Sequence, residues 1–326
     1  MTNDDETIPP VASGDGETVA AFIGTGTMGR PMAHRVLAAG FPLRVHDAVP
    51  SATAPLADAG ATPCASAAEA ADGARIVLLS LPGPEQVVDA VTGPDGVLAA
   101  SRAPAFVVDL STNSVDAVRL LGERCAERGV VFVDAPVSGG VAKARDGSLS
   151  VMVGAGRDAF DAVHPVLSAI GGDVIHVGPP GSGTIAKIVN NQLFLAAGVL
   201  VQEAYVLGRA LGMAPDDLHR IIGAGSAGPY AKLAPLLLGR RFDDVIFRLD
   251  IAAKDVGLAV ETATAAGVDA PMTRAAIDVY RGAVDAGDGD LVFHATLREL
   301  ERRAGVELEI LRRRPRPDAA PGGAAS

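Results

Sequence analysis

Between residues 18 and 178, short apolar runs alternate with helix-length segments, and this alternation constrains the fold more than any other feature. The runs with the length of buried strands are "TVAAFIG", "PLRVHD", "ARIVLLSLP", "AFVVDLS", "VVFVDAP", "LSVMVG" and "DVIHVG". The segments "MGRPMAHRVLAAG" and "SVDAVRLLGERCAERG" are typical of helices that end at glycine. Strands and helices in alternation predict βαβ units and a mainly parallel sheet.

The strand pattern stops near residue 180, and the rest of the chain has helical patterns. The helices expected there cover residues 183–211, 215–224, 229–239, 250–266, 271–286 and 290–303. We therefore expect an α/β domain over 18–180 and an all-α domain over 181–305, joined by the long first helix. The polar arm 1–17 and the Pro-, Ala- and Arg-rich tail 306–326 have compositions typical of disorder.

Composition restricts the class of partner. The chain has 326 residues, 48% of them hydrophobic, which suffices for a sizeable core. The net charge of -11, without a basic stripe, argues against nucleic acid and anionic membrane surfaces as partners. The longest apolar stretch, 193–201, falls short of the ~20 residues that cross a bilayer, so we expect no membrane span.

Cysteine and histidine usage indicates the compartment and excludes a metal centre. Cys64 and Cys125 lie in unrelated contexts without a disulfide framework, which favours a reduced, cytoplasmic environment. The histidines are dispersed and show no metal-ligand spacing, so no metal site is predicted.

A glycine-rich turn joins the first expected strand to the first helix. In "FIGTGTMGRPMA", Gly24, Gly26 and Gly29 form the pattern G-x-G-x-x-G, with Thr27 and Met28 before the third glycine. The first glycine permits a tight turn, the second lets backbone approach a pyrophosphate, and the third allows close helix–sheet packing. Because strand, turn and helix follow in this order, the segment predicts a Rossmann-type dinucleotide site.

An acidic residue after the second strand supports this interpretation. Asp47 ends "PLRVHD", about 20 residues beyond the turn, where a carboxylate can accept hydrogen bonds from the ribose hydroxyls of an adenosine. A carboxylate there would repel a 2′-phosphate, which favours NAD as the cofactor. Arg30 and Arg44 lie close enough in sequence to weaken this preference, so NADP stays possible.

Two polar side chains interrupt the otherwise apolar segment "GTIAKIVNNQLFLAAGVLV", residues 183–201. Lys187 and Asn191 are four residues apart and lie on one face of the expected helix. On an arbitrary helix such a lysine would extend to solvent. In a chain that also carries a dinucleotide site, such a lysine is a candidate general acid and base, and an asparagine on the same helix face can orient a substrate.

Two further segments carry weaker signals. Ser138, Gly139 and Gly140 follow a strand in "FVDAPVSGGVAKARDGSLSVMVG", where a hydroxyl and backbone amides can bind a carboxylate, although such loops are often structural. Lys254 precedes Asp255 in "IAAKDVGLA", a pair that is usually a solvated ion pair.

Together these segments make the chain resemble the β-hydroxyacid dehydrogenase family, within the 6-phosphogluconate dehydrogenase superfamily. The motifs "FIGTGTMGRPMA", "DAPVSGGVAKARDGSLSVMVG", "GSGTIAKIVNN" and "AAKDVGLA" occur in the order of that family. The resemblance implies an NAD(P)-dependent oxidoreductase that acts on a small β-hydroxy acid or its semialdehyde. It also implies a homodimer or homotetramer formed through the helical domain.

The resemblance further implies roles for individual residues. It makes Lys187 the catalytic lysine, with Asn191 and the loop of Ser138, Gly139 and Gly140 holding the substrate. The residues implied to line the cofactor are Gly24, Gly26, Thr27, Met28, Gly29, Asp47, Leu81, Pro82, Gln86, Thr112 and Lys254.

The substrate stays open at this point. "FRLD", before Lys254, resembles tartronate semialdehyde reductases, whereas "FPLRVHDAVP" is more similar to 3-hydroxyisobutyrate dehydrogenases. Two alternatives share the architecture: an imine reductase and a non-catalytic dinucleotide-binding module. Lys187 disfavours both, because imine reductases typically carry another proton donor there and a binding module has no need of a lysine.

Overall fold

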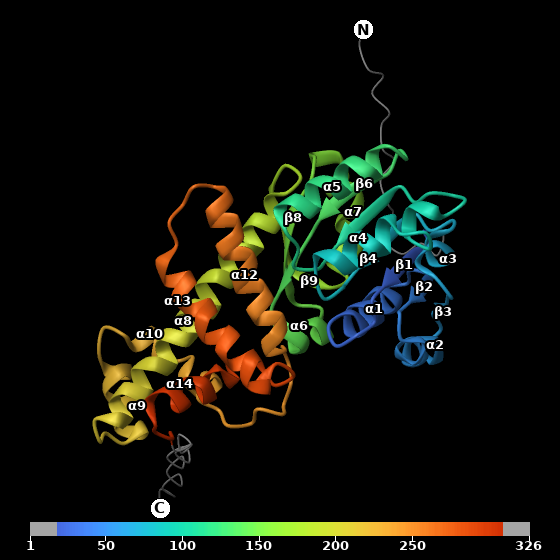
Figure 1. The fold of residues 1–326 in the computed structure, drawn as a ribbon. Coiled ribbons are helices and arrows are strands. Elements are labelled where there is room, and N and C mark those ends of the chain that lie inside the picture. Colours follow the sequence, from blue (N-terminus) through green and yellow to red (C-terminus); the bar gives the residue numbers. More distant parts are fainter. Residues whose placement is uncertain (1–17, 309–326) are drawn as a thin grey trace, which may run out of the picture. The chain divides into compact units, whose positions relative to one another are not determined.

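The computed structural model describes residues 18–308 (Figure 1), so the arm 1–17 and the tail from residue 309 lie outside the described residues. The chain forms two compact units. The first, here called the sheet unit, comprises the described residues up to Phe194 together with Ile251–Arg274. The second, the helical unit, comprises Leu195–Asp250 and the described residues from Ala275 onward.

The sheet unit contains one mainly parallel sheet, as the sequence predicts. Its strands are β1 (Ala20–Ile23), β2 (Leu43–His46), β3 (Thr62–Pro63), β4 (Ile76–Leu79), β5 (Phe106–Asp109), β6 (Val131–Asp134), β7 (Val137–Ser138), β8 (Leu149–Gly154) and β9 (Gly171–Gly178). The strand order is β3-β2-β1-β4-β5-β6-β8-β7, and β9 pairs with β8. Strands β1 to β6 pair in parallel, whereas β8 runs antiparallel to β6 and β7.

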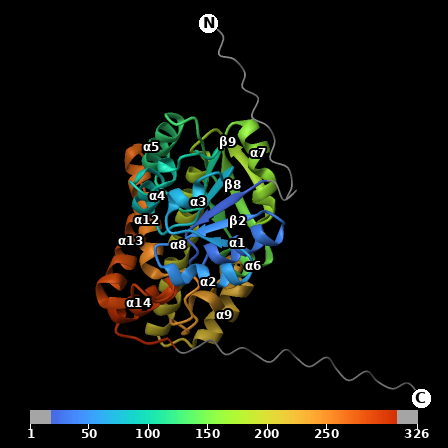
Figure 2. The same ribbon diagram turned by 90° about the vertical axis from the view of Figure 1, so that its right-hand side faces the viewer.

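Helices cover both faces of this sheet. They are α1 (Gly29–Ala38), α2 (Ala54–Asp58), α3 (Ala67–Ala71), α4 (Pro84–Thr92), α5 (Val115–Ala126), α6 (Gly140–Asp146) and α7 (Arg157–Ser168), with 3₁₀ turns at Pro50–Thr53 and Val97–Ala99. Figure 2 shows α3, α4 and α5 on one side of the strands and α1, α6 and α7 on the other.

Alternate residues of each strand supply the two cores. Phe22 and Leu78 belong to a buried cluster with side chains of α1 and α7, whereas Ile23 and Leu79 belong to a second cluster with α3, α4 and α5. Successive strand side chains point to opposite faces, so a strand covered on both sides must be apolar throughout. This is why these strands appear in the sequence as continuous apolar runs.

The strand order defines where a ligand can bind at one edge of the sheet. From β1 the chain builds β2 and β3 on one side and then returns to place β4 on the other side of β1. Ligands of such sheets bind outside the carboxyl ends of the strands where the order reverses. Here that point lies between β1 and β4.

Helices make up the rest of the described chain. They are α8 (Ser182–Ala210), α9 (Pro215–Ala224), α10 (Gly228–Ala231), α11 (Ala234–Leu237), α12 (Leu249–Ala265), α13 (Pro271–Ala283) and α14 (Thr296–Ala304), with a π-helical turn at Val284–Asp288 and a 3₁₀ turn at Phe293–Ala295. The single helix expected over 229–239 is wrong, because Pro235, in the first turn of α11, cannot continue a helix begun at α10. The expected helix 271–286 is α13 over Pro271–Ala283, and it continues into the π-helical turn Val284–Asp288, where Gly287 adopts φ +88°.

Within residues 18–308, α8 is the helix that is long and apolar enough to cross a membrane by length and composition, and 39% of its most apolar window is buried. Two polar side chains of α8 are themselves buried and bonded to protein groups. Asn191 donates to Asp255, and Gln202 donates to the carbonyl groups of Leu237 and His294. Such contacts are those of a helix in a protein core.

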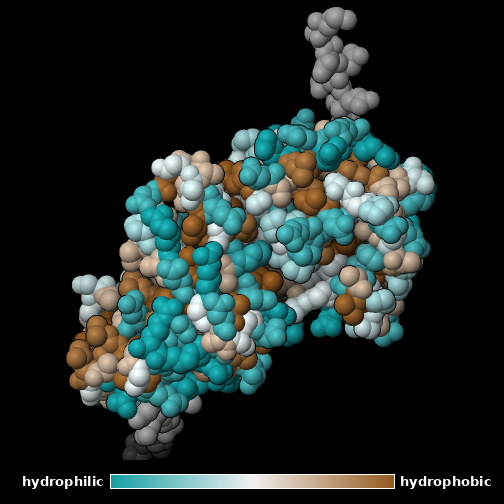
Figure 3. Space-filling view, viewed as in Figure 1, coloured by the Kyte–Doolittle hydropathy of each residue, from teal (hydrophilic) through white to brown (hydrophobic). Residues whose placement is uncertain are grey.

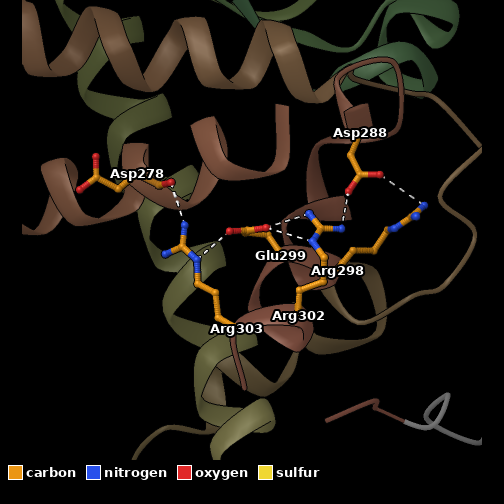
Figure 4. Close-up of polar contacts among 6 residues, drawn as sticks. All are labelled: Asp278, Asp288, Arg298, Glu299, Arg302 and Arg303. Atoms are coloured by element: carbon orange, nitrogen blue, oxygen red, sulfur yellow. Dashed lines mark hydrogen bonds and ion pairs between the residues drawn. The ribbon is translucent and has the colours of Figure 1, made fainter. Parts of the chain in front are cut away.

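A network of charged side chains holds the end of the helical unit together (Figure 4). Asp288, in the π-helical turn, is buried and forms ion pairs with Arg298 and Arg302 of α14. Arg302 and Arg303 both donate to Glu299, and Arg303 also donates to the carbonyl oxygen of Asp278 in α13. These interactions fix α14 against α13, so this charged cluster has a structural role.

Candidate active site

In the glycine turn, Gly24 and Gly29 are packed closely against the protein, whereas the space beside Gly26 is open. Gly24 has φ +88°, and a Cβ there would lie 2.3 Å from the carbonyl oxygen of Ser80. A Cβ on Gly29 would lie 1.8 Å from the carbonyl oxygen of Gly24, so the close helix–strand approach requires glycine. A Cβ on Gly26 would meet nothing within 4 Å. The open space beside Gly26 is where a ligand can approach the backbone, as a bound pyrophosphate requires.

The Asp47 carboxylate lies beside this turn. Its Oδ2 accepts hydrogen bonds from the backbone amide of Thr25 at 2.6 Å and from the Thr25 hydroxyl at 3.2 Å. Its Oδ1 accepts from the amide of Val49 at 2.9 Å. Arg44 is engaged elsewhere, since its Nη1 donates to the carbonyl oxygen of Asp72 at 2.6 Å.

The other predicted cofactor residues follow parallel strands at the same edge of the sheet. Leu81 and Pro82 come after β4, and the Leu81 amide donates to the Ser111 hydroxyl, which follows β5, at 2.9 Å. Thr112 also follows β5 and is half-buried. Because β1, β4 and β5 are parallel, these loops share the carboxyl edge with the glycine turn.

The remaining predicted cofactor contacts on helices are more exposed. Thr27 is exposed and Met28 half-buried at the start of α1, and Gln86 is exposed in the first turns of α4.

The loop of Ser138, Gly139 and Gly140 begins in β7 and ends at the start of α6. Ser138 pairs with Ser150 of β8, and Gly139 and Gly140 adopt φ values of +134° and +71°. Such conformations favour glycine. Among the described residues, no hydrogen bond or ion pair links this loop to Lys187 or Asn191, so its role depends on the resemblance.

A buried carboxylate that the sequence did not single out anchors the start of α8. Asp134 ends β6 and is 1% exposed; its two oxygens accept from the amides of Gly181 at 2.7 Å and Thr184 at 2.8 Å. These amides belong to the first turn of the helix, where donors lack helical partners. Burial raises the pKa of Asp134 to about 6. Lys187 lies one turn beyond this anchor.

A second buried carboxylate brings Asn191 and Lys254 together. Asp255 of α12 is 2% exposed; its Oδ2 accepts from the Asn191 amide at 2.7 Å, and its Oδ1 forms an ion pair with the Lys254 ammonium at 2.8 Å. Lys254 also donates to the carbonyl oxygen of Thr112 at 3.0 Å. The pair of Lys254 and Asp255 is therefore not a solvated ion pair, because it ties α12 to the carboxyl edge of the sheet.

Lys187 faces this cluster without a bond of its own. Within residues 18–308 its ammonium makes no hydrogen bond or ion pair, and the residue is half-buried. Burial lowers the pKa of Lys187; the charge of Asp255 acts to raise it and that of Lys254 lowers it further. A lysine whose pKa is lowered supplies more neutral amine near neutral pH, as a general base requires.

Sequence reasoning missed Asp134 and undervalued Asp255, and each had only a weak signal. Asp134 is a carboxylate at a strand end, and Asp255 an acidic residue beside a lysine in an apolar helix. In residues 18–308, no group of three or more His, Cys, Asp or Glu side chains could hold a metal ion, and Cys64 and Cys125 are free thiols.

The fold and the site define a class. A doubly covered parallel sheet with an open Gly26 at its switch point, together with a lysine anchored near the same edge, is the arrangement of a nicotinamide-dependent dehydrogenase. Residues 19–178 match the NAD-binding domain of 6-phosphogluconate dehydrogenase, and residues 181–300 match the NAD-binding domain of NADP-dependent 3-hydroxyisobutyrate dehydrogenase.

Individual relatives agree with these matches. The chain is 36% identical to 2-(hydroxymethyl)glutarate dehydrogenase of Eubacterium barkeri, over 88% of this chain and 96% of that protein. It is 37% identical to NAD-dependent L-serine dehydrogenase of Pseudomonas aeruginosa, over 80% of this chain and 90% of that protein. A solved structure of Mycobacterium tuberculosis 3-hydroxyisobutyrate dehydrogenase with L-serine superposes with a TM-score of 0.78 and 32% identity, covering 87% of this chain and 99% of that one.

The chain belongs to the β-hydroxyacid dehydrogenase family, which confirms the resemblance seen in its motifs. It is an NAD(P)-dependent oxidoreductase that acts on the CH–OH group of a hydroxy acid.

Proposed function

We propose that the substrate is a 3-hydroxypropanoate substituted at carbon 2, oxidised at its CH₂OH group to the semialdehyde. The relatives support this, because 2-(hydroxymethyl)glutarate, L-serine and 3-hydroxyisobutyrate all carry CH₂OH on the carbon next to a carboxylate. In this chain the substrate carboxylate is assigned to the loop of Ser138, Gly139 and Gly140, and the hydroxyl to Lys187 and Asn191.

The residues at the glycine turn fit a dinucleotide cofactor. Gly26 leaves space for close approach of a pyrophosphate, and the Asp47 carboxylate stands beside the turn with Thr25. NAD is the preferred cofactor in this proposal, because Asp47 would repel a 2′-phosphate and the Arg44 guanidinium donates to the carbonyl oxygen of Asp72 rather than to Asp47. Thr27, Met28, Leu81, Pro82, Gln86, Thr112 and Lys254 are assigned to line the same cofactor.

The chemistry then follows from the protein's own groups. When bound, the nicotinamide ring accepts or gives a hydride. The neutral Lys187 amine takes the hydroxyl proton during oxidation, and the Lys187 ammonium returns it to the oxygen during reduction. Asn191, fixed by its bond to Asp255, holds the substrate oxygen in the geometry needed for transfer.

One observation carries the proposal: both helices of the cluster are tied to the carboxyl edge of the sheet. Asp134 at the end of β6 binds the start of α8, and Thr112 after β5 binds Lys254 of α12. These two bonds support a position of Lys187 near the edge of the sheet that carries the glycine turn.

The organisation of the chain completes the proposal. Residues 18–180 form the dinucleotide-binding domain, and residues 181–305 the helical domain through which copies of the chain associate. Exposed apolar side chains of the helical unit support the association, among them Leu200, Leu207, Leu211 and Ile221. Figure 3 shows apolar surface over the end of this unit, where Figure 1 labels α9 and α10. We expect a dimer or tetramer in light scattering after size exclusion.

The test is a spectrophotometric panel that follows NADH and NADPH formation. We expect turnover with 3-hydroxyisobutyrate, L-serine or 2-(hydroxymethyl)glutarate, and none with these acids after the CH₂OH group is replaced by CH₃. Failure of all hydroxy acids, with tight NADH binding retained, would support a non-catalytic dinucleotide-binding module. Reduction of a cyclic imine, with the hydroxy acids inert, would support an imine reductase.

A further inference from the structure

We propose that Asp255 is a positioning residue for the reaction, whose single buried carboxylate holds the Asn191 amide through one oxygen and the Lys254 ammonium through the other. The inference rests on the proposed function and adds a residue to it. Asp255 touches neither reacting atom; it acts through the two side chains that it holds.

The geometry leaves Asn191 with one orientation. Its Nδ2 donates to Asp255 at 2.7 Å, and its Oδ1 accepts from the Asn190 amide at 3.2 Å. Asn191 is 6% exposed and Asp255 2% exposed, so neither polar group can exchange its partner for bulk water. Without the carboxylate, a buried amide would lack an acceptor, and the asparagine would rotate to find another.

The same carboxylate balances charge around Lys187. The charged groups that face Lys187 are Asp255 and Lys254, both from α12, and the charge of Lys254 also acts to lower the pKa of the buried Asp109 at the end of β5. Asp255 opposes the charge of Lys254 at 2.8 Å, so that burial dominates the environment of Lys187. Removing either charge leaves the other uncompensated beside Lys187.

The two charges therefore act on Lys187 in opposite directions, which a structural role alone does not predict. Asp255→Asn keeps an oxygen that can accept from Asn191 but removes the negative charge, so the pKa of Lys187 falls. Lys254→Met removes the positive charge, so the pKa of Lys187 rises. We expect the rising limb of kcat/KM for alcohol oxidation to move to lower pH in the first variant and to higher pH in the second, by about one unit each.

A second measurement tests the contact between Asp255 and Asn191. We expect Asp255→Ala and Asn191→Ala each to lower kcat by about 100-fold, the effect of misplacing a reacting group by roughly 1 Å. The kcat of the double variant should lie less than about tenfold below that of either single variant, because both substitutions remove the same interaction. Effects that multiply would overturn the proposal.

Lysine NMR separates this inference from the proposed function. The chain has only Lys143, Lys187, Lys232 and Lys254, so the signal of Lys187 can be assigned with Lys187→Arg and titrated without turnover. An inactive wild type would overturn the proposed function, whereas an active wild type with the same Lys187 titration in Asp255→Asn and Lys254→Met would overturn this inference. Asp161→Asn, which removes an exposed carboxylate paired with Arg157, is the matched control and should leave titration and kcat unchanged.

Discussion

Two alanine substitutions in the glycine turn should separate cofactor binding from folding. Gly26→Ala places a methyl group where nothing lies within 4 Å, and Gly26 is not among the glycines with positive φ. Gly29→Ala places the same group 1.8 Å from the carbonyl oxygen of Gly24. The first change alters only the space open to a ligand, whereas the second alters the packing of α1 on β1.

The expected magnitudes follow from these distances. An ordinary Cβ contact begins at 3.4 Å, so Gly29→Ala requires a displacement of 3.4 − 1.8 = 1.6 Å between backbone segments. Overpacking of this kind costs about 3 kcal/mol, of which about 1 kcal/mol is recovered from the helix propensity of alanine. The net loss of about 2 kcal/mol corresponds to a decrease in Tm of about 4–8 °C. Gly26→Ala should raise the free energy of unfolding slightly, by about 0.4–1 kcal/mol, because alanine restricts the unfolded chain.

The assay is thermal unfolding with and without NADH. At an NADH concentration 100 times the wild-type Kd, bound cofactor adds about 2.7 kcal/mol to stability, and a variant that binds 100-fold more weakly keeps only about 0.4 kcal/mol. We expect Gly26→Ala to unfold slightly above the wild-type Tm without NADH and to lose most of the stabilisation by NADH. A Gly26→Ala protein that NADH stabilises fully, or a Gly29→Ala protein with the wild-type Tm, would refute the reasoning.

Three further predictions concern single side chains. Lys187→Met should lower kcat by about 10²–10⁴-fold, with the affinity for NADH unchanged in a fluorescence titration. In the wild type, oxidation should become faster as the pH rises through the lowered pKa of Lys187, because the neutral amine is the base. Asp47→Asn should raise the ratio of kcat/KM with NADP to that with NAD by about tenfold or more; an unchanged ratio would remove Asp47 from cofactor selection. The pKa of Asp134 is raised from 3.8 to about 6, so its contribution to stability is present below pH 4 and is lost as pH rises through 6. The unfolding free energy of the wild type, relative to Asp134→Asn in urea, should therefore fall by about 3 kcal/mol between pH 3 and pH 7, and a constant difference would contradict the raised pKa.

The sequence predicted the strands that carry the sheet because their burial on both faces makes them continuous apolar runs. It could not predict β3 and β7, since two residues are too short to show a period. The helix expected over 229–239 was wrong for a local reason, the proline at residue 235. Patterns of apolar residues thus identify the longer helices and strands, and they miss strands of only two residues, such as β3 and β7.

The candidate site divides in the same way. Gly24, Gly26 and Gly29 could be predicted because the turn, its strand and its helix are contiguous in the chain. Asp134 and Asp255 act on residues 47 and 64 positions away along the chain, and no local pattern records which group such a carboxylate will meet. Their burial is the physical information that the sequence lacked.

These two carboxylates also explain how Lys187 can be fixed in place and yet free to react. An ammonium held by its own hydrogen bonds would be a poor base, because each bond to the charged form raises its pKa. Here Asp134 fixes the turn of α8 before Lys187, and Asp255 fixes Asn191 in the turn after it. The backbone of α8 sets the position of Lys187, and its side-chain nitrogen, which has no hydrogen bond within residues 18–308, can bind the substrate. Weakening the Asp134 anchor should therefore lower kcat while leaving in place the effects of burial, Asp255 and Lys254 on the pKa of Lys187, which distinguishes loss of position from loss of basicity.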